Sequence, residues 1–157
     1  MRNYLLIALS ILVALVLTLL PIPDRMNWVR PAWVLMVILY WTMDLPYLVN
    51  VGIAWIAGFS VDILEGSLLG EHALAMVVIT YIVNKMAYQL RMYPIVQQSL
   101  SIFVFILLYQ GILYCIQGFI GSLPYSKLYW LSSLSSMFLW PWVYFLLNDY
   151  QRRFRIV

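Results

Sequence analysis

The sequence predicts an all-α integral membrane protein with six transmembrane helices in a single polytopic domain, residues 1–157. Hydrophobic residues make up 65% of the chain and charged residues 10%, whereas soluble domains average about 45–50% and roughly 25%. The mean hydropathy is +0.92. The charged residues also separate apolar runs that approach the length of a membrane span, about 20 residues. This composition excludes a soluble enzyme, a nucleic-acid-binding domain and a disordered linker.

The first expected span covers residues 4–20, which are almost entirely Leu, Ile, Val and Ala. A basic start before an apolar run is also typical of a signal peptide. The run is long for the apolar core of such a peptide, and Pro21-Ile22-Pro23-Asp24 lacks the small-residue cleavage pattern. We therefore expect this segment to be retained as a span.

Five further apolar segments follow, at residues 32–43, 51–64, 73–90, 99–120 and 128–148. Pro46 and Asn50 favour a turn between the second and third, so we expect those two to form a tight hairpin. The second to fourth segments are short or polar for a span. We expect them to be tilted, broken or sheltered from lipid by their neighbours.

The distribution of Lys and Arg predicts that both termini are cytoplasmic. Basic residues are enriched in the cytoplasmic loops of membrane proteins. Six spans place six basic residues on the cytoplasmic side and three on the outer side; the first group is Arg2, Lys85, Arg91, Arg152, Arg153 and Arg155, and the second is Arg25, Arg30 and Lys127. A five-span alternative fits this rule less well.

The most informative motif combines small residues with one acid. Gly58, Asp62, Gly66 and Gly70 recur every four residues, which on a helix makes one face. Small residues on such a face allow close helix packing, so we interpret it as a helix-packing or partner-binding surface. An acid in a membrane segment marks function by default, for example ion or proton handling, but we favour a structural role, in which Asp62 bonds a partner helix or caps the following turn. In a structural role, exchange to Asn should have a mild effect, because interhelical hydrogen bonds average about 0.6 kcal/mol.

Two other groups are candidates for packing or binding. Arg30, Pro31 and Trp33 open the second segment, where Arg30 is expected to anchor at the interface; an ion pair with Asp62 or Glu65 stays open. In the fifth segment a polar face contains Gln110, Tyr114 and Gln117. Such a face bonds to other helices or lines a substrate cavity, and the pattern does not separate the two.

The sequence lacks the residues for familiar catalytic or metal sites, so we assign no catalytic residue, metal or cofactor. Its one histidine, His72, cannot form a two-histidine metal motif, and we expect it to be exposed in a loop. No G-x-S-x-G motif is present. The lone Cys115 excludes an intrachain disulfide.

A combined pattern resembles the MreD family of rod shape-determining proteins. The pattern is densest across residues 28–77 and includes Arg30-Pro31-Ala32-Trp33, Val49-Asn50-Val51-Gly52, Asp62, Gly66-Ser67 and Leu69-Gly70, with Trp140-Pro141-Trp142 near the end. The resemblance implies a non-enzymatic protein of the bacterial inner membrane. The implied partners belong to the cell-wall elongation machinery: an MreC-like membrane protein, the MreB filament, the RodA polymerase and its penicillin-binding transpeptidase.

The same resemblance implies a fold similar to the substrate-binding membrane subunits of energy-coupling-factor transporters, and hence a cavity. Two functions therefore remain open at this stage. The first is a membrane scaffold for cell-wall elongation. The alternative is a substrate-binding membrane component of a small-molecule transporter. The first is favoured because the dense pattern matches it and no convergent set of charges indicates a substrate.

Overall fold

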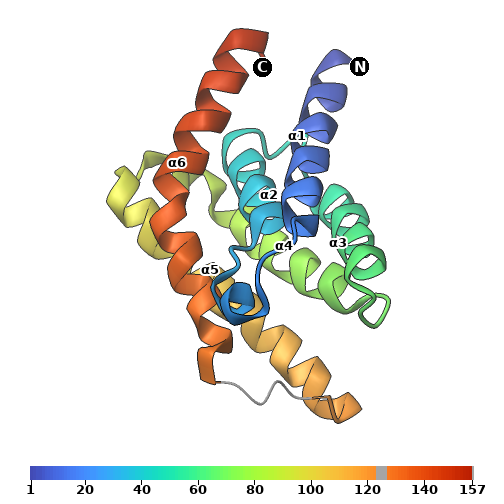
Figure 1. Ribbon diagram of the computed structural model, residues 1–157. Coiled ribbons are helices and arrows are strands. Elements are labelled where there is room, and N and C mark those ends of the chain that lie inside the picture. Colours follow the sequence, from blue (N-terminus) through green and yellow to red (C-terminus); the bar gives the residue numbers. More distant parts are fainter. Residues whose placement is uncertain (123–126, 157) are drawn as a thin grey trace.

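The computed structural model describes residues 1–122 and 127–156, and within them all regular structure is helical. Six α-helices alternate in direction, so that the N- and C-termini lie at the same end of the molecule (Figure 1). The helices are α1 (Arg2–Leu19), α2 (Trp33–Asp44), α3 (Val51–Glu65), α4 (Glu71–Met92), α5 (Ile95–Ile120) and α6 (Leu131–Phe154). Two 3₁₀ helices, η1 (Asp24–Val29) and η2 (Lys127–Trp130), precede α2 and α6. Each of the six expected segments coincides with one helix.

Four of the helical segments are long and apolar enough to cross a membrane: α1, α4, α5 and the stretch Lys127–Phe154 that contains α6. The other two helices are short. At about 1.5 Å per residue, the 12 residues of α2 and the 15 of α3 reach roughly 18 Å and 22 Å, against a hydrocarbon core of about 30 Å. The expectation of six separate spans is therefore met by length for four helices only.

Helix α2 lies inside the bundle, as expected of a segment sheltered from lipid. Ten of its 12 residues are buried, and its main neighbours are α1, α4 and α6. Helix α1, in contrast, buries only Ile7, Ile11 and Ala14. Most of its other large apolar side chains are exposed, as lipid contact requires, while Leu6 and Leu15 are partly buried against the core.

The expected tight hairpin of the second and third segments is wrong. Helix α3 packs mainly against α4, and α2 packs against α1, α4 and α6 rather than against α3. The turn itself is present: the Asn50 side chain accepts a hydrogen bond from the Gly52 amide and caps α3. A turn residue fixes where the chain reverses, but burial decides which helix each face meets, and α4 offers the larger contact.

The closest approach of α3 and α4 occurs at Gly58. A Cβ atom added there would lie 2.5 Å from the Ala73 Cα, 2.8 Å from the Ala73 nitrogen and 2.9 Å from the His72 carbonyl oxygen. These are backbone atoms and cannot rotate away. Only glycine allows the first turn of α4 to rest against α3 at this distance.

We predict that Gly58→Ala destabilises the protein by about 1–3 kcal/mol, the usual range for overpacking a tight core. Gly111→Ala is the matched control, because Gly111 is helical and has nothing within 4 Å of its added Cβ. It should be neutral or stabilising by up to about 1 kcal/mol, since alanine favours a helix. Thermal unfolding of the purified variants in detergent tests both. Equal melting temperatures for the two variants would contradict the close α3–α4 contact.

Candidate functional site

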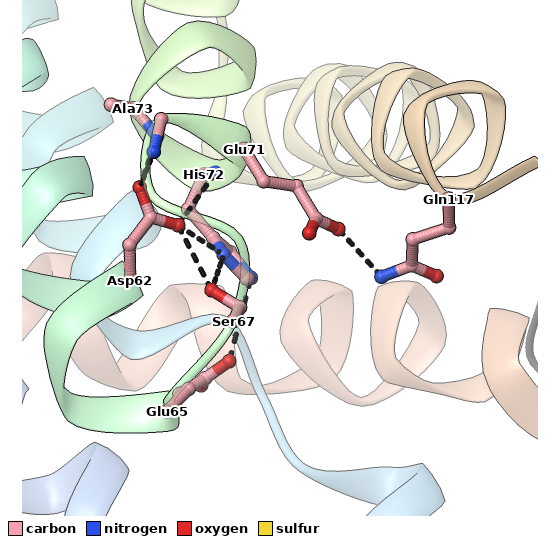
Figure 2. A network of polar contacts seen from close by, with 8 residues as sticks. Asp62, Glu65, Ser67, Glu71, His72, Ala73 and Gln117 are labelled. Atoms are coloured by element: carbon pink, nitrogen blue, oxygen red, sulfur yellow. Dashed lines mark hydrogen bonds and ion pairs between the residues drawn. The ribbon is translucent and has the colours of Figure 1, made fainter. Parts of the chain in front are cut away.

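A network of polar side chains occupies the junction of α3 and α4, at the end of the molecule opposite the termini (Figures 1 and 2). At its centre is the carboxylate of Asp62, which is fully buried. Figure 2 shows Asp62 facing the first turn of α4, with His72 and Ser67 around it and the Glu71–Gln117 pair to one side. The acid that the sequence singles out therefore lies between two helices.

The chain reverses direction between these helices through two glycines in the left-handed backbone region. Gly66 ends α3 with φ +65°, and Gly70 precedes α4 with φ +100°. The Ser67 amide donates to the Asp62 carbonyl oxygen, the bond that closes a Schellman motif at a helix end. Residues with a Cβ rarely adopt these angles, so both glycines shape the turn.

This geometry corrects the predicted face of four residues. Helix α3 ends at Glu65, so Gly66 and Gly70 are not on its surface, and nothing lies within 4 Å of an added Cβ at either. Of the four residues, only Gly58 and Asp62 lie on α3 and contact α4. The four-residue spacing continued past the helix end because the turn also required glycine.

The Asp62 carboxylate caps the N-terminus of α4. One oxygen, Oδ2, accepts from the backbone amides of Gly70 (2.8 Å) and Ala73 (3.4 Å). The other, Oδ1, accepts from the His72 amide (2.9 Å) and the Ser67 hydroxyl (3.1 Å). The first amides of a helix have no partner within it, and Gly70 has no side chain to supply one. Asp62 supplies it from α3, where the α4 dipole also favours its negative charge.

His72 is part of this network and is not an exposed loop residue, contrary to the expectation from sequence. It lies in the first turn of α4 with its side chain only 12% exposed. Its Nδ1 is 2.8 Å from Asp62 Oδ1, and its Nε2 is 3.4 Å from Glu65 Oε2. Sequence reasoning missed this pairing because Asp62 and His72 are ten positions apart, across two glycine turns whose path the residue spacing does not specify.

The arrangement of Ser67, His72 and Asp62 differs from a catalytic triad. In a triad the serine bonds one imidazole nitrogen and the acid bonds the other. Here both Asp62 Oδ1 and Ser67 Oγ (3.3 Å) contact Nδ1, while Nε2 faces Glu65. Ser67 also donates to Asp62, so its hydroxyl is engaged in holding the cap. Among the described residues no group of three His, Cys, Asp or Glu side chains has the geometry to hold a metal ion.

A cavity of about 580 Å³ opens beside this network. Its walls come from the η1 region, α2, the end of α3, α4, α5 and η2, and include Trp28, Arg30, Trp33, Glu65, His72, Tyr109, Gln110, Gln117 and Tyr129. Small-molecule sites commonly have volumes of about 300–1,000 Å³. The cavity is therefore large enough for a small ligand or a head group.

The polar face of α5 is split by the structure. Gln110 and Gln117 line the cavity and bond across it: Gln110 Nε2 donates to the Tyr129 carbonyl (3.1 Å) and Gln117 Nε2 to Glu71 Oε1 (2.6 Å). Tyr114 does not join them. It is 39% exposed and packs against Trp130, because the four-residue step from Gln110 rotates it toward η2.

The segment Arg30-Pro31-Ala32 is held against α6 by serines. Ser132 Oγ donates to the Arg30 carbonyl, and Ser136 Oγ accepts from the Ala32 amide (3.1 Å). The Arg30 side chain donates to the Leu20 carbonyl (3.0 Å) and forms no ion pair with Asp62 or Glu65. These contacts place Pro31 and Trp33 on the cavity wall.

A second polar cluster lies near the termini. Asp44, at the end of α2, contacts Arg91 Nε (3.3 Å) and accepts from Gln151 Nε2 (2.5 Å), while Tyr40 donates to Gln151 Oε1 (2.9 Å). Arg152 and Arg153 follow on α6, Arg155 comes directly after the helix, and all three are exposed. Helices α2, α4 and α6 are thus tied together at the end of the molecule that carries most of the positive charge.

Taken together, the fold and the site define a multi-pass helical membrane protein whose central polar residues join helices. Residues 1–150 match the family described as rod shape-determining protein MreD. The chain is also 31% identical over 147 residues to the rod shape-determining protein MreD of Haemophilus influenzae, an alignment that covers 92% of this chain and 89% of that protein. The chain belongs to the MreD family. No solved structure matches it, so the expected likeness to transporter subunits stays a prediction.

We predict that Asp62→Asn destabilises the protein by about 1–3 kcal/mol, the penalty for leaving buried polar groups unpaired. In the wild-type protein, backbone N–H groups donate to both carboxylate oxygens of Asp62. The side-chain NH₂ group of the variant therefore faces a backbone N–H in either of its orientations, and two donors cannot bond. The structure thus replaces the mild effect expected from sequence with a large one. Asp149→Asn is the control, because Asp149 forms an exposed ion pair with Arg153, a kind worth little. Thermal unfolding in detergent should separate the two variants, and equal stability would contradict the cap.

Proposed function

We propose that this protein is a non-enzymatic membrane scaffold of the bacterial cell-wall elongation complex, required for rod shape and lateral peptidoglycan synthesis. Membership of a rod shape-determining family over nearly the whole chain carries the proposal. The structure supports it because the buried acid, the histidine and the serine of the central network hold one another and the start of α4. A group engaged in this way is suited to rigidity rather than to chemistry.

The proposed partners are an MreC-like membrane protein, the MreB filament, the RodA polymerase and its penicillin-binding transpeptidase. Exposed apolar side chains along α1 and α5, such as Leu9, Leu12 and Leu100, offer surface for lipid or for partner helices. The exposed basic end at Arg152, Arg153 and Arg155 is the part we assign to the cytoplasmic side. Any contact with a filament beneath the membrane would have to be made at that end.

For the orientation we propose six crossings in the inner membrane with both termini cytoplasmic. The shared location of the termini requires an even number of passes (Figure 1). The Asp44–Arg91–Gln151 cluster joins Arg91, one of the basic residues expected on the cytoplasmic side, to the C-terminal part of α6. In this orientation the short helix α2 crosses within the shelter of the longer helices, whereas the short helix α3 packs on α4 and keeps Trp55, Ile56 and Ile63 exposed.

A second candidate function is a substrate-binding membrane component of a small-molecule transporter. The cavity of about 580 Å³, with aromatic and polar walls, is the observation that favours it. The two functions differ in their phenotypes, because loss of a transporter component removes uptake of one nutrient and leaves the cell shape unchanged.

We expect depletion of this protein from its rod-shaped host to produce rounded, widening cells while nutrient uptake is maintained. Re-expression of the wild-type chain should restore rods, and co-purification in detergent should recover a tagged MreC-like partner. Rods that persist after depletion, together with loss of uptake of one solute, would favour the transporter function instead.

We expect reporter fusions placed after Met92 and at the C-terminal end to report the cytoplasm, and a fusion after Asn27 to report the outer side. The reason is the six-to-three distribution of basic residues between the two sides. Alkaline phosphatase and fluorescent-protein reporters read the two sides with opposite signals. An outer location for the C-terminal fusion would contradict the six-crossing orientation.

A further inference from the structure

We propose that the polar cavity and an adjoining apolar groove together form a binding site for one phospholipid molecule with a phosphoethanolamine head group. The head group would occupy the cavity beside Arg30, and one acyl chain would lie in the groove between α1, α2 and α6. This inference goes beyond the scaffold function and does not depend on it.

The groove has the chemistry of a hydrocarbon site. Its volume is about 330 Å³, and its walls are mainly aliphatic: Leu9, Val13, Ala14, Leu17, Val37, Val143, Leu146 and Leu147. The two hydroxyl-bearing residues beside them are already bonded within the protein. Ser10 accepts from the Trp41 indole and donates to the Ile7 carbonyl, and Tyr150 donates to the Leu6 carbonyl. An acyl chain satisfies such walls, whereas water does not.

The groove and the cavity are adjacent. Trp33 lines both, and the consecutive α1 residues Leu17 and Thr18 line the groove and the cavity respectively. From Leu9 to Leu17 the groove follows α1 for about 12 Å at 1.5 Å per residue. An amphiphile with its polar end beside Trp33 would therefore have the groove next to it for a chain along α1.

Arg30 gives the cavity an unpaired cation. Its guanidinium has one hydrogen bond, to the Leu20 carbonyl, and its Nε is buried without a partner. No acidic side chain among the described residues forms an ion pair with it. Guanidinium groups bind phosphate with charge-assisted hydrogen bonds. A lipid phosphate at the mouth of the groove would supply the missing partner.

The same cavity also presents acceptors that require a donor on the ligand. Gln110 is only 5% exposed, and its Oε1 has no hydrogen-bond partner. The acidic residues Asp24 and Glu65 also line the cavity. A phosphate alone would be repelled by these acids, whereas an ammonium group offers donors and positive charge. A zwitterionic phosphoethanolamine therefore fits both halves of the cavity.

Native mass spectrometry of the purified full-length protein, exchanged into detergent with defined lipids, tests the proposal. Phosphatidylethanolamine should remain bound as one molecule per chain. Phosphatidylcholine is the matched lipid, because it has the same charge but no N–H donors, and phosphatidylglycerol carries the phosphate without an ammonium group. Both should be retained at least roughly tenfold less, the effect of losing a charged hydrogen bond.

Two pairs of variants locate the site. Arg30→Gln should weaken retention roughly tenfold or more, while Arg25→Gln, on the exposed part of η1 away from the cavity, should not. Val13→Trp should block the groove, whereas Val16→Trp, exposed on α1 outside it, should leave binding intact. Unchanged melting temperatures would show that the variants fold.

Several results would overturn the proposal. Equal retention of the three lipids would contradict the assignment of a phosphoethanolamine head group. Retention at the wild-type level by Arg30→Gln would contradict the placement of the head group in the cavity beside Arg30. A partner's transmembrane helix that cross-links to the groove and excludes lipid would identify a protein occupant instead. The two proposals fail separately. Rods that persist after depletion, with lipid retention as expected, would contradict the scaffold function alone. Rounded cells after depletion, with no selective lipid retention, would contradict this inference alone.

Discussion

The structure depends on one interaction, the hydrogen bonding of the buried Asp62 carboxylate to the amides at the start of α4, which have no partner within that helix. Helix α4 is the central element, with α2, α3 and α5 packed against it. Its first turn is buried against α3 at Gly58 and cannot be hydrated there. Unpaired amides in such a place would cost about 1–3 kcal/mol each. A carboxylate from α3 accepts hydrogen bonds from several of them at once. These bonds offset the free-energy cost of burying a charge in an apolar chain.

The remaining polar residues extend the same principle to both ends of the bundle. At one end His72, Glu65, Glu71 and Gln117 link α3, α4 and α5. At the other, Asp44, Arg91 and Gln151 link α2, α4 and α6. Lipid supplies no hydrophobic force that drives helices together, so polar bonds and close packing must define their arrangement. Such bonds make the helix bundle rigid, which agrees with membership of a rod shape-determining family.

Much of the fold was predictable because apolar runs and charge positions determine where membrane helices begin and end. The sequence also identified Asp62 and Gly58, since an acid and a small residue in an apolar segment are both unusual. It did not reveal which helix each would meet. The spacing of Gly66 and Gly70 was misread because glycine serves both close packing and left-handed turns. His72 was missed because its position depends on those turns. Tyr114 was grouped with Gln110 and Gln117 on one polar face because small rotations along α5, which the spacing does not resolve, decide which residues face inward.

The most direct test of the central claim is hydrogen exchange of the Gly70, His72 and Ala73 amides, followed by mass spectrometry or NMR in detergent. If Asp62 caps α4, these amides exchange slowly in the wild-type protein. In Asp62→Ala they should exchange much faster, while the amides in the middle of α5 keep their protection. Fast exchange at these three amides in the wild-type protein, or equal protection in the variant, would contradict the account.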